Sequence, residues 1–403
     1  MSRCSLSIKQ PAALAWAAVL CVVLFAQTYV RAERPDGIDL TSYLLSARAL
    51  LHGDSPYLLP TPFPYLYPAT LAFLLIPLTF VPAAVAVAVW FAVSVAAGVW
   101  SIRAIVRHAR PNVERTDSIV FLAIFFTVFI SIAQSNLRNG QVNFIVLALC
   151  VAAAAPAARL KPRAPSTGIE REAQMEREAQ MEREALAERS GALSWSLAVA
   201  IKIIPVAFVP YFMLRRSWRW MLVSAALIAG WCLIPFVLVG TRIIDIYEQY
   251  WRVFLATGLA VHPQPLDFSL AGTIARLTGT PLTPMLKASA AAMVIGWILQ
   301  ADARRLRPRH GVAFALYSLA IPLLSPQSEV HHLAFMMPAA AISGSALWWD
   351  WRHARRALQI ATIVAIALYL AATTSPIASG PLFCASMLAF GVAAIQSHHV
   401  VDH

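Results

Sequence analysis

The chain has 403 residues, of which 59% are hydrophobic and only 13% are charged, and its mean hydropathy is +0.65. Apolar runs of about 20 residues recur along it, and each is long enough to cross a bilayer, so a polytopic membrane protein is indicated and a soluble one is excluded. The net charge of +12 does not point to nucleic acid, because the Lys and Arg residues form short clusters between apolar runs, as cytoplasmic loops do. The five cysteines are scattered without metal-ligand spacing.

The first polar segment, residues 31–66, follows an apolar run from about Pro11 to Val30 that is expected to be a retained span. This segment is therefore expected on the outer side of the membrane. Within it, apolar residues at helical spacing predict an amphipathic helix from Leu40 to Leu51 that lies along the membrane surface, with Ser42 and Ser46 on its polar side.

Two acids stand at the entrance of this predicted helix. Asp39 is placed to be its N-cap, or a chemical group that faces an outer cavity, or both. Asp36, within the sequence Pro-Asp-Gly, is either a turn residue or a second functional acid.

The middle of the chain contains a hydrophilic insert, residues 157–190, with the near-perfect repeat EREAQM. Because it has no apolar seam, we expect a solvated cytoplasmic helix or a disordered segment. The next apolar run, Gly191 to Leu214, is interrupted by Lys202 and Pro205, which favours a pair of short half-helices. The whole chain, residues 1–403, is expected to form a single all-α membrane domain of about 10 to 12 transmembrane helices.

Placing the basic loops inside the cell puts four polar segments on one outer face: 36–39, 136–143, 262–276 and 325–332. Polar groups at the ends of spans are costly unless they have a partner or a task, so this convergence indicates a shared cavity. The sequence contains no Walker A loop, GxSxG, HExxH or dinucleotide motif. We predict neither a metal nor a cofactor, because adjacent histidines such as His331 and His332 point about 100° apart on a helix.

Several motifs occur along the chain in a fixed order: D-L-x-x-Y from Asp39, L-x-G-x-x-P-Y from Leu51, Y-x-Y-P, N-G-Q-x-N from Asn139, Lys202-Ile-Ile-Pro205 followed by RRSWR, and Ser325-Pro326 followed by His331-His332. Together they resemble the multispan glycosyltransferases of family 87, the DUF2029 group, which contains polyprenyl-phosphate-mannose-dependent α-1,2-mannosyltransferases. One departure concerns the second outer loop. Asp267-Phe268-Ser269-Leu270 stands where this family suggests Asn-Gln-Ser-Leu, which puts acceptor recognition by that loop in question.

The resemblance implies a GT-C fold and a polyprenyl-phosphate sugar, with mannose favoured, as the donor to a lipid or glycan acceptor. In that setting Asp39 is predicted to be the general base that takes the proton of the acceptor hydroxyl. The leaving phosphate needs cations or hydrogen-bond donors, and sugar hydroxyls need polar partners. The residues predicted for these substrate contacts are His331, His332, Gln141, Asn143, Tyr43, Arg138, Arg276, Lys202 and Tyr57.

Alternatives remain for several of these residues and for the function. Lys202 could instead extend to the cytoplasmic headgroups, and Tyr57, Phe63, Tyr65 and Tyr67 could form an interfacial belt. The rival functions are a transporter or flippase of a lipid-linked sugar, which usually shows internal repeats, and a ligase of preassembled chains. In each case we expect a multi-pass protein in contact with membrane lipids, in a bacterial plasma membrane, with its site on the outer face and no nucleic-acid partner.

Overall fold

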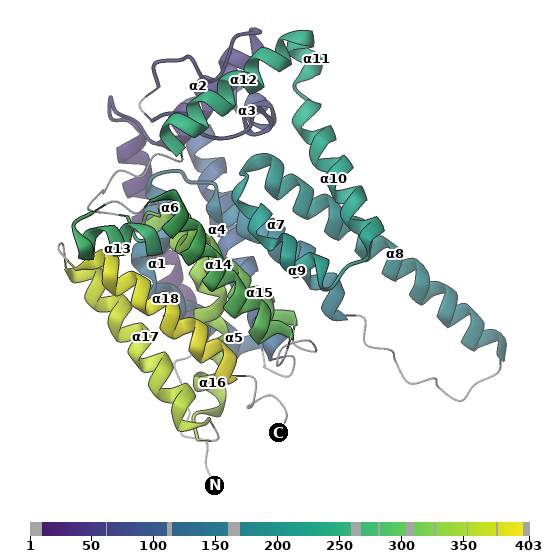
Figure 1. Cartoon of the computed structure of the whole chain (residues 1–403), viewed down its shortest axis with the longest axis vertical. Coiled ribbons are helices and arrows are strands. Elements are labelled where there is room, and N and C mark those ends of the chain that lie inside the picture. Colours follow the sequence, from purple (N-terminus) through teal and green to yellow (C-terminus); the bar gives the residue numbers. More distant parts are fainter. Residues whose placement is uncertain are drawn as a thin grey trace.

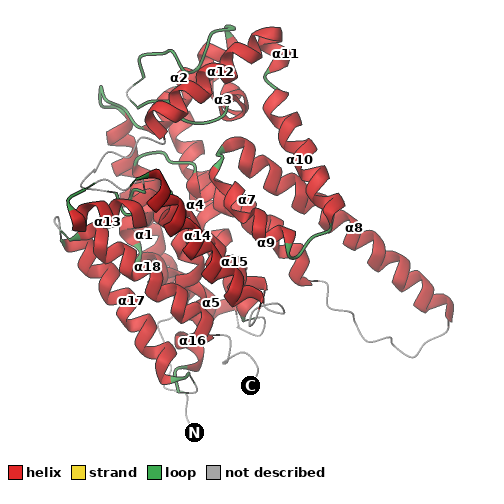
Figure 2. Cartoon of the chain, viewed as in Figure 1, coloured by secondary structure: helices red, strands yellow, loops and turns green. Residues whose placement is uncertain are grey.

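The computed structural model describes residues 10–61, 63–110, 115–159, 170–258, 267–280, 283–303, 310–325, 328–352, 354–375 and 378–397. Within these ranges the chain is built from helices and contains no strand (Figure 2), which confirms the predicted all-α class. Residues 262–266 and Pro326, predicted for the outer face, and residues 160–169 of the insert lie outside these ranges.

Six stretches in the described part are long and apolar enough to cross a membrane: α1 (Gln10–Ala32), α4 (Ala83–Ala109), Trp218–Ala256, Val330–Asp350, α17 (Arg356–Thr374) and α18 (Ser379–Gln396). A seventh arises if α5 (Arg115–Val128) and α6 (Ile130–Arg138), which are bent by 76°, count as one broken span. Shorter apolar helices lie beside them, including α14 (Pro284–Ala301) and α15 (His310–Leu324). The chain is therefore a multi-pass integral membrane protein.

The stretch Trp218–Ala256 contains several consecutive helices, and Val330–Asp350 contains a 3₁₀ helix followed by an α-helix. These are α10 (Trp218–Leu233), α11 (Phe236–Val239), η3 (Gly240–Arg242), α12 (Ile243–Val253) and the start of η4 (Phe254–Gly258), then η6 (Val330–Met336) and α16 (Met337–Asp350). In Figure 1, α12 lies at one end of the molecule with α2 (Asp39–Leu51) and α3 (Ala69–Leu75), which is followed by η1 (Ile76–Phe80). The two chain termini lie at the opposite end.

Helix α2 forms where the sequence predicted a helix, and Arg48 on its polar side is exposed, but the serines of that side do not face solvent. Ser42 and Ser46 are both buried. The Ser46 hydroxyl donates to the carbonyl of Pro56 (3.2 Å), and the Ser42 hydroxyl accepts the amide N–H of Phe63 (3.2 Å). The expectation of an exposed polar side is wrong for these two serines, because the loop after α2 folds back over them and its backbone groups need their hydroxyls as partners.

The tyrosines of the same loop are also buried, which excludes an interfacial belt. Tyr57, Tyr65 and Tyr67 are each less than 9% exposed. The ring of Tyr67 lies 4.9 Å, centroid to centroid, from the ring of Tyr43 on α2. This aromatic layer fixes the loop onto α2 and so determines where the start of α2 lies.

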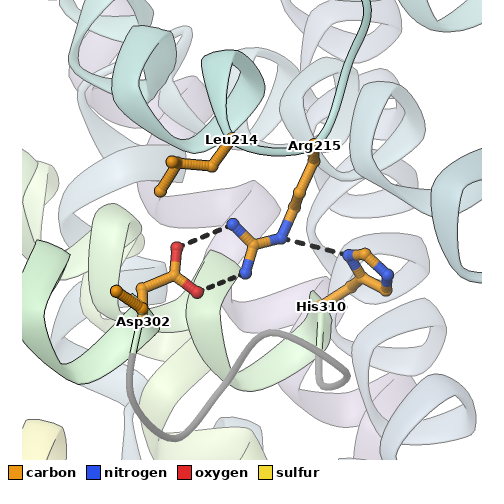
Figure 3. A pocket seen from close by; sticks show the side chains of 5 residues that line it. Leu214, Arg215, Asp302 and His310 are labelled. Carbon is orange, nitrogen blue, oxygen red and sulfur yellow. Dashed lines mark hydrogen bonds and ion pairs between the residues drawn. The ribbon is translucent and has the colours of Figure 1, made fainter.

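Basic clusters lie together at the end of the bundle where α4, α14 and α16 finish. Arg110, after α4, forms an ion pair with Asp350 of α16. Arg215, after α9 (Val209–Met213), donates from Nη1 to Oδ2 of Asp302 (2.7 Å) and from Nε to Nδ1 of His310 (3.1 Å), beside a cavity lined by these three side chains (Figure 3). These contacts link the end of α4 to the end of α16, and the end of α9 to the end of α14 and the start of α15.

Helix α8 (Glu170–Ile201) contains the EREAQM repeat and continues without a break into the membrane domain, packing against α7 (Asn143–Arg159) and α10. Figure 1 shows the part with the repeat extending away from the bundle. The helix stops at Ile201, because Pro205 has no N–H to donate to the Ile201 carbonyl, and η2 (Ile204–Phe208) and α9 follow. Lys202 is placed at this break.

Candidate active site

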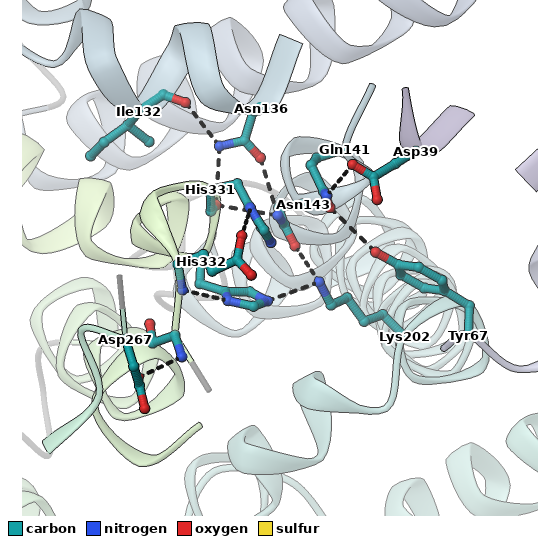
Figure 4. A network of polar contacts seen from close by, with 12 residues as sticks. Asp39, Tyr67, Ile132, Asn136, Gln141, Asn143, Lys202, Asp267, His331 and His332 are labelled. Atoms are coloured by element: carbon teal, nitrogen blue, oxygen red, sulfur yellow. Dashed lines mark hydrogen bonds and ion pairs between the residues drawn. The ribbon is translucent and has the colours of Figure 1, made fainter. Parts of the chain in front are cut away.

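Polar side chains from separate segments meet beside the start of α2 in two hydrogen-bonded groups, one around Gln141 and one around Lys202 (Figure 4). Nζ of Lys202 lies 5.4 Å from the centroid of the Tyr67 ring, which brings the two groups together. Asp39 comes from α2, Gln141 from the turn before α7, Asn143 from the start of α7, Lys202 from the break after α8, and His332 from η6. These residues are distant in sequence, and all were among the predicted site residues.

Asp39 is the first residue of α2 and not its N-cap, so the predicted capping role is wrong. Ile38 occupies the cap position, and its amide N–H is accepted by the hydroxyl of Thr41 (3.1 Å). The carboxylate of Asp39 turns instead toward Gln141, whose Nε2 donates to Oδ2 at 2.7 Å. Helical periodicity shows where α2 begins, but it does not show that the turn before α7 supplies a partner for the Asp39 carboxylate.

The turn that carries Gln141 is pressed against α2. The amide N–H of Asp39 donates to the carbonyl of Asn139 (3.0 Å), and Trp90 of α4 donates from Nε1 to the carbonyl of Gly140 (2.9 Å). Gly140 has φ of +65°, and a Cβ there would lie 2.9 Å from Cβ of Leu40. Only glycine suits this backbone conformation and close approach, which gives the N-G-Q-x-N motif a physical reason.

The orientation of the Gln141 amide is set by tyrosines. The hydroxyl of Tyr67 donates to Oε1 of Gln141 (3.3 Å), and the hydroxyl of Tyr43 donates to that of Tyr67 (2.8 Å). The hydroxyl of Tyr57 donates to the backbone carbonyl of Tyr67 (2.9 Å) from behind. The amide NH₂ of Gln141 therefore faces Asp39, and the predicted residues Tyr43 and Tyr57 act through Tyr67.

Asn143 joins Lys202 to the histidine segment. Nζ of Lys202 donates to Oδ1 of Asn143 (2.8 Å), while Nδ2 of Asn143 donates to the backbone carbonyl of His331 (3.2 Å). Nδ2 of Asn136 donates to the same carbonyl (3.0 Å). Lys202 is buried, with 8% exposure, so the alternative in which it extends to the cytoplasmic headgroups is wrong.

The ring of His332 lies beside Lys202. The amide N–H of Glu329 donates to Nδ1 of His332 (3.2 Å), so the neutral ring carries its proton on Nε2. Nε2 lies 3.3 Å from Nζ of Lys202. Lys202 and His332 therefore place two N–H donors side by side. His331 lies behind this pair, with its ring centroid 4.3 Å from that of His332 and Nδ1 3.5 Å from Oε2 of Glu329.

The surroundings make Asp39 a stronger base than an ordinary carboxylate. Burial raises the pKa of Asp39 to about 6, although the hydrogen bond from Gln141 and the positive charge of Lys202 both act to lower it. Burial also raises the pKa of Glu329, again opposed by Lys202. An acid with a raised pKa among polar side chains is typical of proton-transfer sites.

Two predicted residues are not part of these contacts. Arg138 lies at the end of α6 and makes no hydrogen bond or ion pair with the network in the part of the chain described. Arg276 lies at the end of α13 (Leu270–Thr278), beside Gly380 of α18. Within the same ranges, no group of three or more His, Cys, Asp or Glu side chains could hold a metal ion.

Asn136, Tyr67 and Glu329 were not predicted as site residues. Each lies inside a motif that the sequence did point to: Asn136 in SNLRNGQVN, Tyr67 in Y-x-Y-P, and Glu329 just before the histidine pair. Their positions within those motifs are the signal that could have identified them.

Residues 65–326 match the family model described as glycosyltransferase family 87, which is more than half of the chain. The chain belongs to glycosyltransferase family 87. The family match includes Gln141, Asn143 and Lys202, whereas Asp39 and both histidines lie outside it. As a member of this family, the protein is a glycosyltransferase, and the network described above is its candidate active site.

Two similar proteins are known by name. The polyprenol-phosphate-mannose-dependent alpha-(1-2)-phosphatidylinositol mannoside mannosyltransferase of Mycobacterium tuberculosis is 27% identical over 361 residues, which cover 83% of this chain and 75% of that relative. The crystal structure of ArnT from Cupriavidus metallidurans bound to undecaprenyl phosphate has 13% sequence identity and a TM-score of 0.45, covering 96% of this chain and 77% of that one.

The raised pKa of Asp39 predicts an acid limb in the pH profile of sugar transfer. A base acts only when ionised, so kcat/KM should fall as the pH drops below about 6. Gln141→Leu removes the hydrogen bond that lowers this pKa, so its acid limb should move to higher pH. Steady-state rates between pH 4.5 and 8 measure the acid limb of the wild type and that of Gln141→Leu.

Gln134→Leu is the matched control, because the Gln134 amide bonds Gln27 and does not contact the network. It should leave the limb in place. An acid limb that stays unchanged in Gln141→Leu would show that Asp39 is not the group that titrates.

Proposed function

We propose that this family 87 enzyme transfers a single sugar, with mannose favoured, from a polyprenyl-phosphate donor to a lipid or glycan acceptor at the outer face of the cell membrane. The observation that carries the proposal is that a basic carboxylate and a pair of N–H donors lie in neighbouring groups of polar side chains, which meet where Nζ of Lys202 lies 5.4 Å from the Tyr67 ring centroid. Asp39 provides the carboxylate, and Lys202 with His332 provides the pair of N–H donors. Membership of family 87 and the name of the mycobacterial relative support the donor class.

Asp39 is suited to activate the acceptor. Gln141 engages Oδ2, and no other side chain in the described ranges bonds Oδ1. With a pKa near 6, the carboxylate is ionised at neutral pH and still basic enough to take a proton from a hydroxyl. The proton passes to Asp39 while the acceptor oxygen forms a bond to the anomeric carbon of the sugar.

Lys202 and His332 are suited to hold the leaving group. As the bond between the anomeric carbon and the phosphate oxygen breaks, its electron pair moves onto the phosphate. The Nε2–H of His332 and the ammonium of Lys202 lie 3.3 Å apart, so one phosphate oxygen can accept from both. Donors that are fixed before the charge develops stabilise it more than mobile ones do.

The location of the site on the outer face is supported by the different composition of the two ends of the bundle. The basic residues Arg110 and Arg215 are tied at the end where α4, α14 and α16 finish, and such clusters are typical of the cytoplasmic side. The segment with α2 lies at the other end of the molecule, away from the chain termini (Figure 1). A polyprenyl-linked sugar in the outer leaflet would then reach the site laterally.

Asp39→Asn tests the base directly. Asn keeps an oxygen that can accept from Gln141, so the network should remain formed, but the basic carboxylate is lost. Turnover of a labelled polyprenyl-phosphate sugar should fall by roughly 10² to 10⁴-fold, while donor binding changes little.

Asp36→Asn is the control, since this carboxylate is largely exposed and lies 3.7 Å from Arg31. It should keep nearly full activity. Near wild-type transfer by a folded Asp39→Asn variant, or an equal loss in Asp36→Asn, would contradict the role given to Asp39.

Lys202→Met tests the phosphate end, because it removes the charge and keeps the length of the side chain. A hydrogen bond to a charged partner contributes roughly 1.5–3 kcal/mol, so the KM for the donor should rise about 10-fold or more. Lys287→Met on α14, outside the network, should leave the donor KM unchanged. A wild-type donor KM in Lys202→Met would show that the phosphate binds elsewhere.

A further inference from the structure

Asp267, where this chain departs from the family pattern, joins two loops. Its Oδ1 accepts the amide N–H of Ser269 and that of Ser328, each at 2.9 Å. In the opposite direction, the amide N–H of Phe268 donates to the carbonyl of Ser328 (2.7 Å). The segment before α13 and the segment before η6 are thus held together by reciprocal hydrogen bonds.

This connection leads straight to His332. Ser328 precedes Glu329, whose amide N–H donates to Nδ1 of His332. The amide N–H of His332 donates in turn to the carbonyl of Glu329 (2.9 Å). Figure 4 shows Asp267 on the far side of this segment from Lys202. A series of direct contacts therefore runs from Asp267 through Ser328, Glu329 and His332 to Lys202.

The role of Asp267 is separate from the capping of α13. Ser269 is the N-cap, and its hydroxyl accepts the amide N–H of Gly272 (2.9 Å). Asp267 is 1% exposed, and its Oδ2 has no hydrogen-bond partner among the residues that the structure describes. A Cβ at Gly272 would lie 2.2 Å from that oxygen, so the carboxylate is seated against the glycine. Helix α13 has its own cap, so the contribution specific to Asp267 is the hydrogen bond that its Oδ1 accepts from the amide N–H of Ser328.

We propose that Asp267 is a positioning residue of the active site: by fixing Ser328 and Glu329 it sets the tautomer and direction of His332, which presents Nε2–H beside Lys202. It does not contact the substrate. The kinetic consequence rests on the proposed function, because it requires that His332 and Lys202 hold the donor phosphate. The structural consequence, the Nε2–H tautomer of His332, does not depend on it.

The test compares variants of the full-length protein. Asp267→Ala removes the acceptor of both amides, and Gly272→Ala displaces the carboxylate while keeping its charge and favouring the helix. Both should raise the donor KM by about 10-fold. Asp267→Asn retains an acceptor oxygen and should stay within about 3-fold of wild type, as should Ser269→Ala, which removes only the helix cap.

A second readout does not need activity. In protein labelled with ¹⁵N-histidine, the ring resonances of His332, assigned by their loss in His332→Gln, should report the Nε2–H tautomer in wild type. They should move toward a mixture of tautomers in Asp267→Ala and Gly272→Ala. In the His332→Gln background, Asp267→Ala should add little further loss of activity.

Two results would overturn the proposal. One is an unchanged tautomer and donor KM in both Asp267→Ala and Gly272→Ala. The other is an equal change in Ser269→Ala, which would make the effect one of α13 stability. If the tautomer shifts as expected but the wild type does not use a polyprenyl-phosphate sugar, the positioning role stands and the proposed function fails.

Discussion

The site depends on the need to pair polar groups that are buried between membrane helices. A buried donor or acceptor without a partner costs on the order of 1–3 kcal/mol, and an unpaired charge costs more. Asn143 and Lys202 are buried and Asp39 is partly buried, and each is satisfied by a residue from another segment. This requirement holds together a site whose parts are distant in the sequence, and it explains why the turn at Gly140 must lie directly against α2.

The same constraint links stability to chemistry at Asp39. Its pKa in the folded protein is about 6, against an ordinary value of 3.8, because burial disfavours the charged form. The folded state therefore binds this proton more tightly than the unfolded chain, and stability is lost as the pH rises from about 4 through about 6. The loss is on the order of 3 kcal/mol at neutral pH, which Gln141 and Lys202 keep from being larger. The ionised form of Asp39, which the proposed mechanism requires, is thus the less stable form of the site.

Much of this arrangement could be predicted from the sequence, because hydropathy, helical spacing and motif order are local. They gave the all-helical membrane class, the helix after Asp39, the break at Lys202 and most residues of the network. What they could not give was side-chain direction. The carboxylate of Asp39 turns away from its own helix, Ser42 and Ser46 serve a loop that folds back on them, and Lys202 points inward to Asn143. Each of these outcomes depends on a partner supplied from elsewhere in the chain. The link from Asp267 to His332 was hidden for the same reason, since it joins residues of different loops.

The most direct test of this account uses the purified protein reconstituted in vesicles that carry a polyprenyl-phosphate mannose labelled in the sugar, together with a mixture of membrane lipids and glycans as acceptors. We predict that the label leaves the polyprenyl phosphate and appears in an acceptor product, with free polyprenyl phosphate formed in equal amount. Movement of the intact labelled donor between leaflets without release of its sugar would contradict the account and indicate transport instead.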